Sequence, residues 1–154
     1  MARILSFFGS TTQYDYVSSL PYVSQILVGG YSIGTVPAVY LAANREVGEL
    51  FLLAPFANGY DFYNQAAPVF YGPLRLLVKH KFPSDQYAAD IDLPVLIVAS
   101  TGDEIIPYTS SKKLSACFAE TVKFISLSGI GHNGVLLHPK ALESIHDYLL
   151  LSLR

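Results

Sequence analysis

Short apolar runs that alternate with helical patterns are the feature that most limits the fold of this chain of 154 residues. Three such runs end in small or polar residues, and a weaker fourth follows; they cover 25–30, 48–55, 93–102 and 122–127. Continuous apolar stretches of roughly 4–8 residues, bounded by Gly or Pro, are typical of strands buried on both faces. The sequence therefore predicts four buried strands.

Helical patterns lie between or after these runs, at 34–44, 108–120 and 139–153. The last of them begins with Pro139, a residue favoured at the first position of a helix. Alternating strands and helices predict a mainly parallel sheet with right-handed crossovers and flanking helices, which is the α/β fold class. Because no repeat or linker interrupts the chain, residues 1–154 are expected to form a single domain.

The stretch 56–92 departs from this alternation because it is aromatic, irregular and interrupted by Pro68, Pro73 and Pro83. One interpretation is a packed excursion that covers one end of the sheet. The other is a cap or lid that shapes a substrate pocket, since long insertions in compact domains often do so. The sequence alone leaves both open.

Composition excludes several classes of protein. Hydrophobic residues make up 51% and charged residues 14% of the chain, which argues against disorder. The net charge of −2 lacks the strongly basic character of a nucleic-acid-binding domain. No apolar stretch is long enough to span a bilayer. A small basic cluster, Arg75 with 79–81, leaves weak contact with a membrane surface as a minor alternative to a solvated face.

A single cysteine, Cys117, cannot form an internal disulfide, and this fits a reducing compartment. We therefore expect a soluble cytoplasmic protein.

The strongest local motif is Gly30-Tyr31-Ser32-Ile33-Gly34, a G-x-S-x-G that follows an apolar strand and precedes a helical pattern. A serine at a tight strand-to-helix turn adopts a strained backbone conformation, and small residues on either side let the neighbouring backbone approach. Its hydroxyl then projects at the N-terminus of a helix, where developing negative charge is favoured. The motif predicts a nucleophile at Ser32.

A serine nucleophile needs a base, and the base needs an orienting acid. Asp103 comes directly after the third apolar run and Glu104 is the competing carboxylate. Asp103 is favoured because it is nearer the end of the strand, whereas Glu104 is expected to point toward solvent.

His132 follows the fourth run and has glycines at 129, 131 and 134, so it is expected in a loop and is the candidate base. The other histidines have weaker claims. The three candidates follow the first, third and fourth runs, and the carboxyl ends of parallel strands meet at one edge of a sheet. Ser32, Asp103 and His132 are therefore expected to meet there.

These motifs make the chain resemble the α/β-hydrolase superfamily over about residues 25–150. The segments 31–37, 94–107 and 131–133 resemble, in particular, the depalmitoylase-like branch of α/β-hydrolase-domain serine hydrolases. The resemblance implies that Ser32 is the nucleophile, His132 the base and Asp103 its orienter. It also implies that the backbone N–H of Ile33 is an oxyanion donor, and that neither a metal nor a cofactor is required.

Members of the superfamily usually place several strands before the nucleophile, and residues 1–24 are too few to hold them. The expected fold is therefore a truncated α/β-hydrolase fold that lacks the N-terminal strands. The strand at 25–30 would then have an unpaired apolar edge, where a second copy or a companion chain could pair.

Two functions follow from the sequence. The first is a serine hydrolase that cleaves an ester or thioester, in a small-molecule, lipid-like or acyl-protein substrate, through an acyl-serine intermediate. The alternative is a catalytically impaired relative of the same fold that binds a partner or self-associates.

Overall fold

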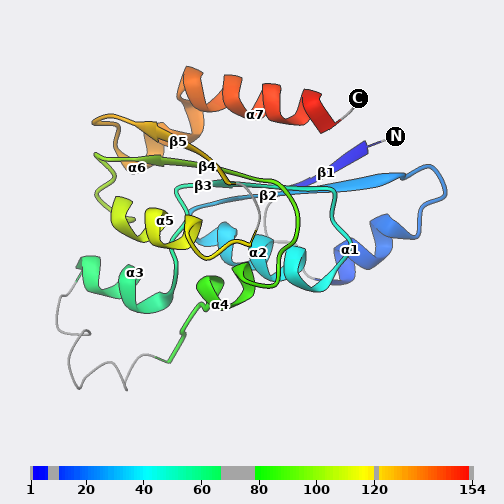
Figure 1. Ribbon diagram of the computed structural model, residues 1–154, viewed down its shortest axis with the longest axis horizontal. Helices are drawn as coiled ribbons and strands as arrows, with labels where there is room; N and C mark the ends of the chain where they lie inside the picture. Colours follow the sequence, from blue (N-terminus) through cyan, green and yellow to red (C-terminus); the bar gives the residue numbers. More distant parts are fainter. Residues whose placement is uncertain (1, 7–10, 67–78, 120–121, 153–154) are drawn as a thin grey trace.

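The computed structural model describes residues 2–6, 11–66, 79–119 and 122–152. Its centre is a sheet of five parallel strands in which the order in space is the order along the chain (Figure 1). The strands are β1 (Ala2–Ser6), β2 (Gln25–Tyr31), β3 (Glu49–Leu53), β4 (Val95–Ser100) and β5 (Val122–Leu127). The four predicted strands correspond to β2 to β5, and the prediction of an α/β fold is confirmed.

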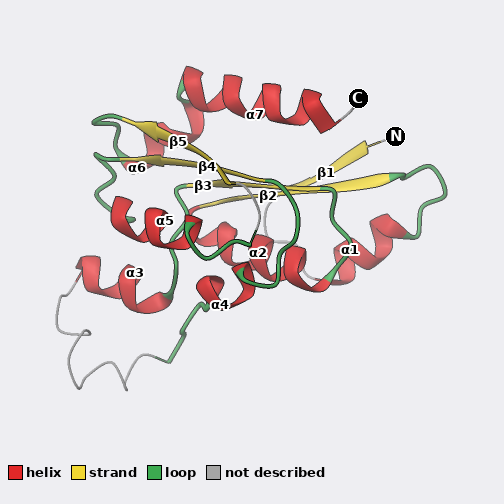
Figure 2. Cartoon of the chain, in the orientation of Figure 1, coloured by secondary structure: helices red, strands yellow, loops and turns green. Residues whose placement is uncertain are grey.

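Helices cover both faces of the sheet (Figure 2). They are α1 (Thr11–Ser18), the 3₁₀ turn η1 (Ser32–Gly34), α2 (Thr35–Asn44), α3 (Gly59–Ala66), α4 (Ser84–Ala88), α5 (Tyr108–Ser115), α6 (His132–Leu137) and α7 (Pro139–Ser152). Right-handed crossovers that always step in the same direction place the connecting helices on one face. Accordingly α1, α2, α4 and α5 lie on one side, and α7, which follows the last strand, lies on the other (Figure 1).

Alternate residues of each central strand point to opposite faces of the sheet. Ile26, Leu50 and Ile97 pack on one side in the core shared with α2 and α5. Phe51 and Leu96 pack on the other side, in the core shared with α6 and α7. All of β3 and β4 is buried, which explains why the sequence of these strands is continuously apolar rather than alternating.

The prediction that the strand at 25–30 has an unpaired edge is wrong. β1 runs parallel to β2 over five residue pairs, from Ala2 opposite Gln25 to Ser6 opposite Gly29. One strand therefore precedes the nucleophile and covers the edge that the sequence analysis left open. The outer edge on this side of the sheet belongs to β1.

The excursion at 56–92 is only partly described, because 67–78 lie outside the described residues. Its two described stems are held together: Asn58 Nδ2 donates to Asp85 Oδ2 at 2.7 Å, and the backbone N–H of Asp85 donates to Ala57 O at 2.8 Å. The rings of Phe56 and Phe82 also meet edge to face, with centroids 6.0 Å apart. The two stems are thus joined to each other, and the cap interpretation stays a prediction.

A buried polar cluster ties the first stem to α5. Asp61 Oδ2 accepts hydrogen bonds from Ser110 Oγ at 2.8 Å and Lys113 Nζ at 3.3 Å. Ser110 Oγ in turn accepts the backbone N–H of Ala57 at 2.9 Å. Buried polar groups need such partners, so the cluster fixes where α3 leaves the sheet. No helix within the described ranges combines the length and apolarity needed to cross a bilayer.

Candidate active site

The turn from β2 into η1 presents Ser32 in a strained conformation. Its φ of 54° lies in the left-handed region, which residues other than glycine rarely adopt. Thr35 Oγ1 donates to Ser32 O at 2.6 Å and holds the turn. A Cβ added to Gly30 would lie 2.5 Å from Gly34 O and 2.7 Å from Thr35 Cα, so only glycine fits there. The predicted nucleophile-elbow geometry is therefore present.

The turn after β4 holds the carboxylate of Asp103 through two backbone hydrogen bonds. Oδ1 accepts the backbone N–H groups of Ile105 at 2.9 Å and Ile106 at 2.8 Å, which leaves Oδ2 for the histidine. The side chain is only 2% exposed. Two backbone donors fix the orientation of the carboxylate and compensate for its burial.

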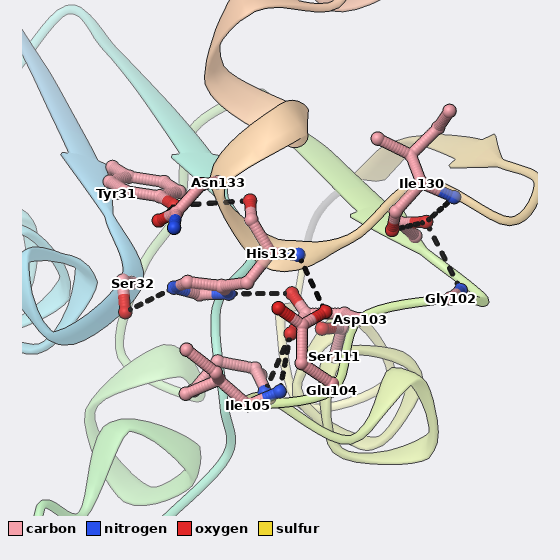
Figure 3. A network of polar contacts seen from close by, with 12 residues as sticks. Tyr31, Ser32, Gly102, Asp103, Glu104, Ile105, Ser111, Ile130, His132 and Asn133 are labelled. Atoms are coloured by element: carbon pink, nitrogen blue, oxygen red, sulfur yellow. Dashed lines mark hydrogen bonds and ion pairs between the residues drawn. The ribbon is translucent and has the colours of Figure 1, made fainter.

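His132 joins the two turns (Figure 3). Its Nδ1 lies 2.7 Å from Asp103 Oδ2, and its Nε2 lies 2.9 Å from Ser32 Oγ. The structure thus brings together the three predicted side chains, which lie directly after β2, in the turn after β4 and in the segment after β5. The prediction that His132 lies in a loop is wrong: it is the first residue of α6, its side chain is 5% exposed, and Gly131 precedes it as the N-cap.

This arrangement can activate a hydroxyl. A carboxylate on Nδ1 favours the tautomer that carries the proton there, which leaves the lone pair of Nε2 facing Ser32 Oγ. The imidazole can then accept the hydroxyl proton, and the carboxylate stabilises the resulting imidazolium. Burial of both partners strengthens this interaction relative to water.

Backbone and hydroxyl contacts join the acid turn to the base segment. Ser100 Oγ donates to Ile130 O at 2.6 Å and accepts the N–H groups of Ile130 at 3.1 Å and Gly102 at 3.2 Å. Gly102 also lies against Gly129, where an added Cβ would come within 2.6 Å of a backbone carbon. These contacts set the separation between Asp103 and His132.

Glu104 has a role that the sequence analysis missed. It was expected to point to solvent, but its Oε2 accepts the backbone N–H of His132 at 2.9 Å. That hydrogen bond, together with one from its own backbone N–H and the nearby imidazole, lowers the pKa of the Glu104 carboxyl. The side chain therefore secures the first turn of α6 although it is solvent-exposed.

Tyr31 is the second residue that sequence reasoning missed. Its ring stacks on the imidazole of His132 with centroids 5.1 Å apart, and its hydroxyl donates to His132 O at 3.0 Å. Burial, and then the negative charges of Asp103 and Glu104, raise the pKa of this phenol. The partners are 101 residues apart, so no local pattern could have indicated the contact.

Ile33, the predicted oxyanion donor, lies in η1 directly after the nucleophile, and its side chain is 45% exposed. Ile105, two residues after Asp103, is 41% exposed. These two exposed aliphatic residues belong to the elbow and to the acid turn. Within the described residues, His, Cys, Asp and Glu side chains form no group of three that could hold a metal ion.

Cys117 is half-buried in the turn after α5, with Sγ 3.3 Å from Lys113 O. Burial raises the pKa of its thiol, which disfavours the nucleophilic thiolate. His80 is exposed and stacks on Phe82. Neither side chain contacts the Ser32 site in the described contacts.

Comparisons with known proteins agree with the α/β fold. No protein-family profile matches the chain. An uncharacterized protein of Mycobacterium tuberculosis is 35% identical over 112 residues, which is 71% of this chain and 38% of that protein. The human alpha/beta hydrolase domain-containing protein 17B is 30% identical over 124 residues, covering 80% of this chain and 41% of that protein. The chain thus spans about two fifths of the length of these curated relatives.

Among solved structures, an acetyl xylan esterase from Paenibacillus sp. R4 superimposes with a TM-score of 0.69. The match covers 89% of this chain and 50% of the esterase at 19% identity, so it shows a shared fold. A parallel sheet with a strained serine turn and a serine–histidine–aspartate set defines a protein of the α/β-hydrolase type. With its curated relatives, the chain belongs to the α/β-hydrolase superfamily.

Proposed function

We propose that the chain is a serine hydrolase that cleaves an ester or thioester through an acyl-serine intermediate. The observation that carries this proposal is the continuous hydrogen-bonded set from Asp103 through His132 to Ser32, at 2.7 Å and 2.9 Å. Structural, non-catalytic serines rarely combine a positive φ, an imidazole at hydrogen-bond distance and a carboxylate behind it. The esterase named among the similar folds supports the same reaction class.

The first half-reaction forms the acyl-enzyme. Ser32 Oγ attacks the carbonyl carbon of the substrate while His132 Nε2 takes the hydroxyl proton, and Asp103 stabilises the imidazolium. The carbonyl oxygen becomes an oxyanion, and the backbone N–H of Ile33 is the donor that we assign to it. The imidazolium then returns the proton to the departing alcohol or thiol, and the bond between the carbonyl carbon and the leaving group breaks.

The second half-reaction regenerates the enzyme. A water molecule takes the place of the leaving group, His132 removes one of its protons, and the hydroxide adds to the acyl carbon. Collapse of this intermediate expels Ser32 Oγ, which recovers its proton from the imidazolium, and releases the carboxylic acid. The balance is one water consumed for each ester or thioester cleaved.

The exposed aliphatic side chains beside the nucleophile favour an apolar acyl group. Ile33 directly follows Ser32, Ile105 is two residues after Asp103, and the two residues are 45% and 41% exposed although most large apolar residues of the described ranges are buried. Exposed apolar surface around a reactive group is typical of a binding site. We therefore infer a small-molecule, lipid-like or acyl-protein substrate. The net charge of −2 favours a protein without a nucleic-acid partner, and the single cysteine favours the cytoplasm as the place of action.

Labelling with a fluorophosphonate probe tests the proposal. The probe reacts only with an activated serine, so the chain should be labelled, and both Ser32→Ala and His132→Ala should abolish labelling. Ser115→Ala is the matched control, because Ser115 is a partly exposed serine at the end of α5 whose hydroxyl donates to Lys112 O in the described contacts. A folded chain that stays unlabelled would overturn the proposal and favour a binding or self-associating relative, including one that pairs a second copy or companion chain along β1.

A further inference from the structure

We infer that Tyr31 is a positioning residue that holds the imidazole of His132 in its reactive orientation, an inference that rests on the proposed function. The two hydrogen bonds of the imidazole leave its ring free to rock. The imidazole is hydrogen-bonded at Nδ1 to Asp103 and at Nε2 to Ser32. These bonds lie at opposite sides of the ring and define an axis, and rocking of the ring about that axis changes neither distance much.

Contact on the face of the ring removes this freedom. The Tyr31 ring lies against the imidazole with an interplanar angle of 26° and a centroid distance of 5.1 Å, within the range of favourable aromatic pairs. Tyr31 is itself packed against the core on the α7 side of the sheet, so it cannot easily follow a rocking imidazole. The two hydrogen bonds set where the imidazole sits, and the stack sets its tilt.

The phenol adds a second restraint on the backbone. Tyr31 Oη donates to His132 O at 3.0 Å, with Asn133 Oδ1 a more distant neighbour at 3.5 Å (Figure 3). Because Tyr31 directly precedes Ser32, this bond joins the backbone of the elbow to the backbone of the base. A displacement of about 1 Å between reacting groups can cost roughly 100-fold in rate, so such a link has catalytic consequence.

The chemistry of the phenol suits the task. Its raised pKa, caused by burial and by Asp103 and Glu104, keeps the hydroxyl protonated and therefore able to donate throughout the neutral range. A phenylalanine would keep the stack and lose this bond, whereas a leucine would lose both. The two replacements therefore separate the two contributions.

The test compares Tyr31→Leu and Tyr31→Phe with the intact chain. We expect the limiting rate of fluorophosphonate labelling to fall about 30-fold for Tyr31→Leu and about fivefold for Tyr31→Phe, with half-saturating probe concentrations unchanged. The matched control is Tyr16→Leu, since Tyr16 on α1 is 67% exposed and far from the contacts described for His132. This control should leave the rate unchanged.

A second readout requires no reaction. The proton on His132 Nδ1, bonded to a buried carboxylate, should give a low-field proton resonance that His132→Ala removes. Tyr31→Phe should retain this resonance, and Tyr31→Leu should broaden or lose it, because a rocking ring exposes the proton to exchange. If Tyr31→Leu keeps both the resonance and the rate, the inference is overturned.

Failure of the proposed function would look different. In that case the intact chain would not be labelled at all, and the resonance alone would decide whether Tyr31 holds the imidazole. If Tyr31→Leu does not fold, Tyr31→Phe decides: an unchanged labelling rate in that variant overturns the role of the hydroxyl link.

Discussion

At the scale of single residues, the site depends on a carboxylate that is held by backbone donors and directed at the imidazole. Replacement of Asp103 by asparagine keeps its shape and its contacts with the N–H groups of Ile105 and Ile106 but removes the charge. The amide can also favour the wrong imidazole tautomer. We expect the labelling rate to fall by up to about 10⁴-fold, the cost of the same change in a well-studied triad.

The measurement is the second-order rate of fluorophosphonate labelling, with an unfolding curve to verify the fold. Asp92→Asn, the same change at an exposed aspartate before β4, is the control and should leave the rate unchanged. A rate within a few fold of the intact chain for Asp103→Asn would remove Asp103 from the triad.

Glu104 gives a prediction about pH. Its pKa is lowered in the folded chain by the hydrogen bond from the His132 N–H, so ionisation of Glu104 favours folding. This contribution is complete above the unfolded carboxyl pKa of about 4.3 and is lost as the pH falls through the lowered value. Glu104→Gln should therefore reduce stability at pH 7, and its difference from the intact chain should shrink in acid.

Urea denaturation at several pH values, for both chains, measures this difference. Glu143→Gln on α7 is the control, because Glu143 is exposed and has no described contact with the site. Since Glu104 is exposed to solvent, added salt should also diminish the difference. A difference that stays constant from pH 7 to pH 3 would argue against the carboxylate as its cause.

Residue types and spacing predicted the three triad residues because each lies where a strand ends and each belongs to a turn with its own chemistry. The partners of those residues could not be predicted in the same way. Glu104 meets the N–H of His132 across 28 residues and Tyr31 meets its carbonyl across 101. Such contacts arise from the packing of separate strands, which leaves no periodic signal in the sequence.

At the scale of elements, the turn between β2 and α2 depends on the close approach of Gly30 to the backbone of Gly34 and Thr35. A methyl group at Gly30 would force these backbones apart. We expect Gly30→Ala to destabilise the fold by about 1–3 kcal/mol, the usual cost of overpacking, and to impair labelling.

Gly134→Ala is the control for this change. Gly134 lies within α6, where alanine is the better helix former, but the added methyl would come 2.7 Å from Ile130 Cγ2, so this one side chain would have to shift. Because a side chain rather than backbone must shift, Gly134→Ala should cost less stability than Gly30→Ala. Thermal unfolding of both variants measures the effects, and equal stabilities would contradict the role given to Gly30.

Elements differed in how well the sequence predicted them. β3 and β4 are continuous apolar runs because both faces are covered, and this pattern was visible. β1 has only five residues, and neither glycine nor proline separates it in the sequence from Phe7 and Phe8. Its pairing with β2 could therefore not be recognised from the local sequence. α6 was missed because it has six residues and contains a glycine, which is typical of loops.

At the scale of the whole molecule, β1 determines whether β2 has a free edge. Deletion of residues 1–6 would leave the apolar strand with unpaired N–H and C=O groups, an arrangement that promotes pairing with other chains. We expect the shortened chain to be less stable and to self-associate, whereas the intact chain should do so less. Light scattering coupled to size-exclusion chromatography measures both. A shortened chain that stays monomeric and stable would contradict the pairing of β1 with β2.

The agreement between strand order in space and strand order along the chain also bears on synthesis. Each strand that leaves the ribosome has its neighbour already made, so the sheet can grow by addition at one side. Ser32 emerges early, Asp103 follows, and His132 emerges only after β5. The hydrogen-bonded set of Ser32, His132 and Asp103 therefore cannot assemble until β5 and the first residues of α6 have been made.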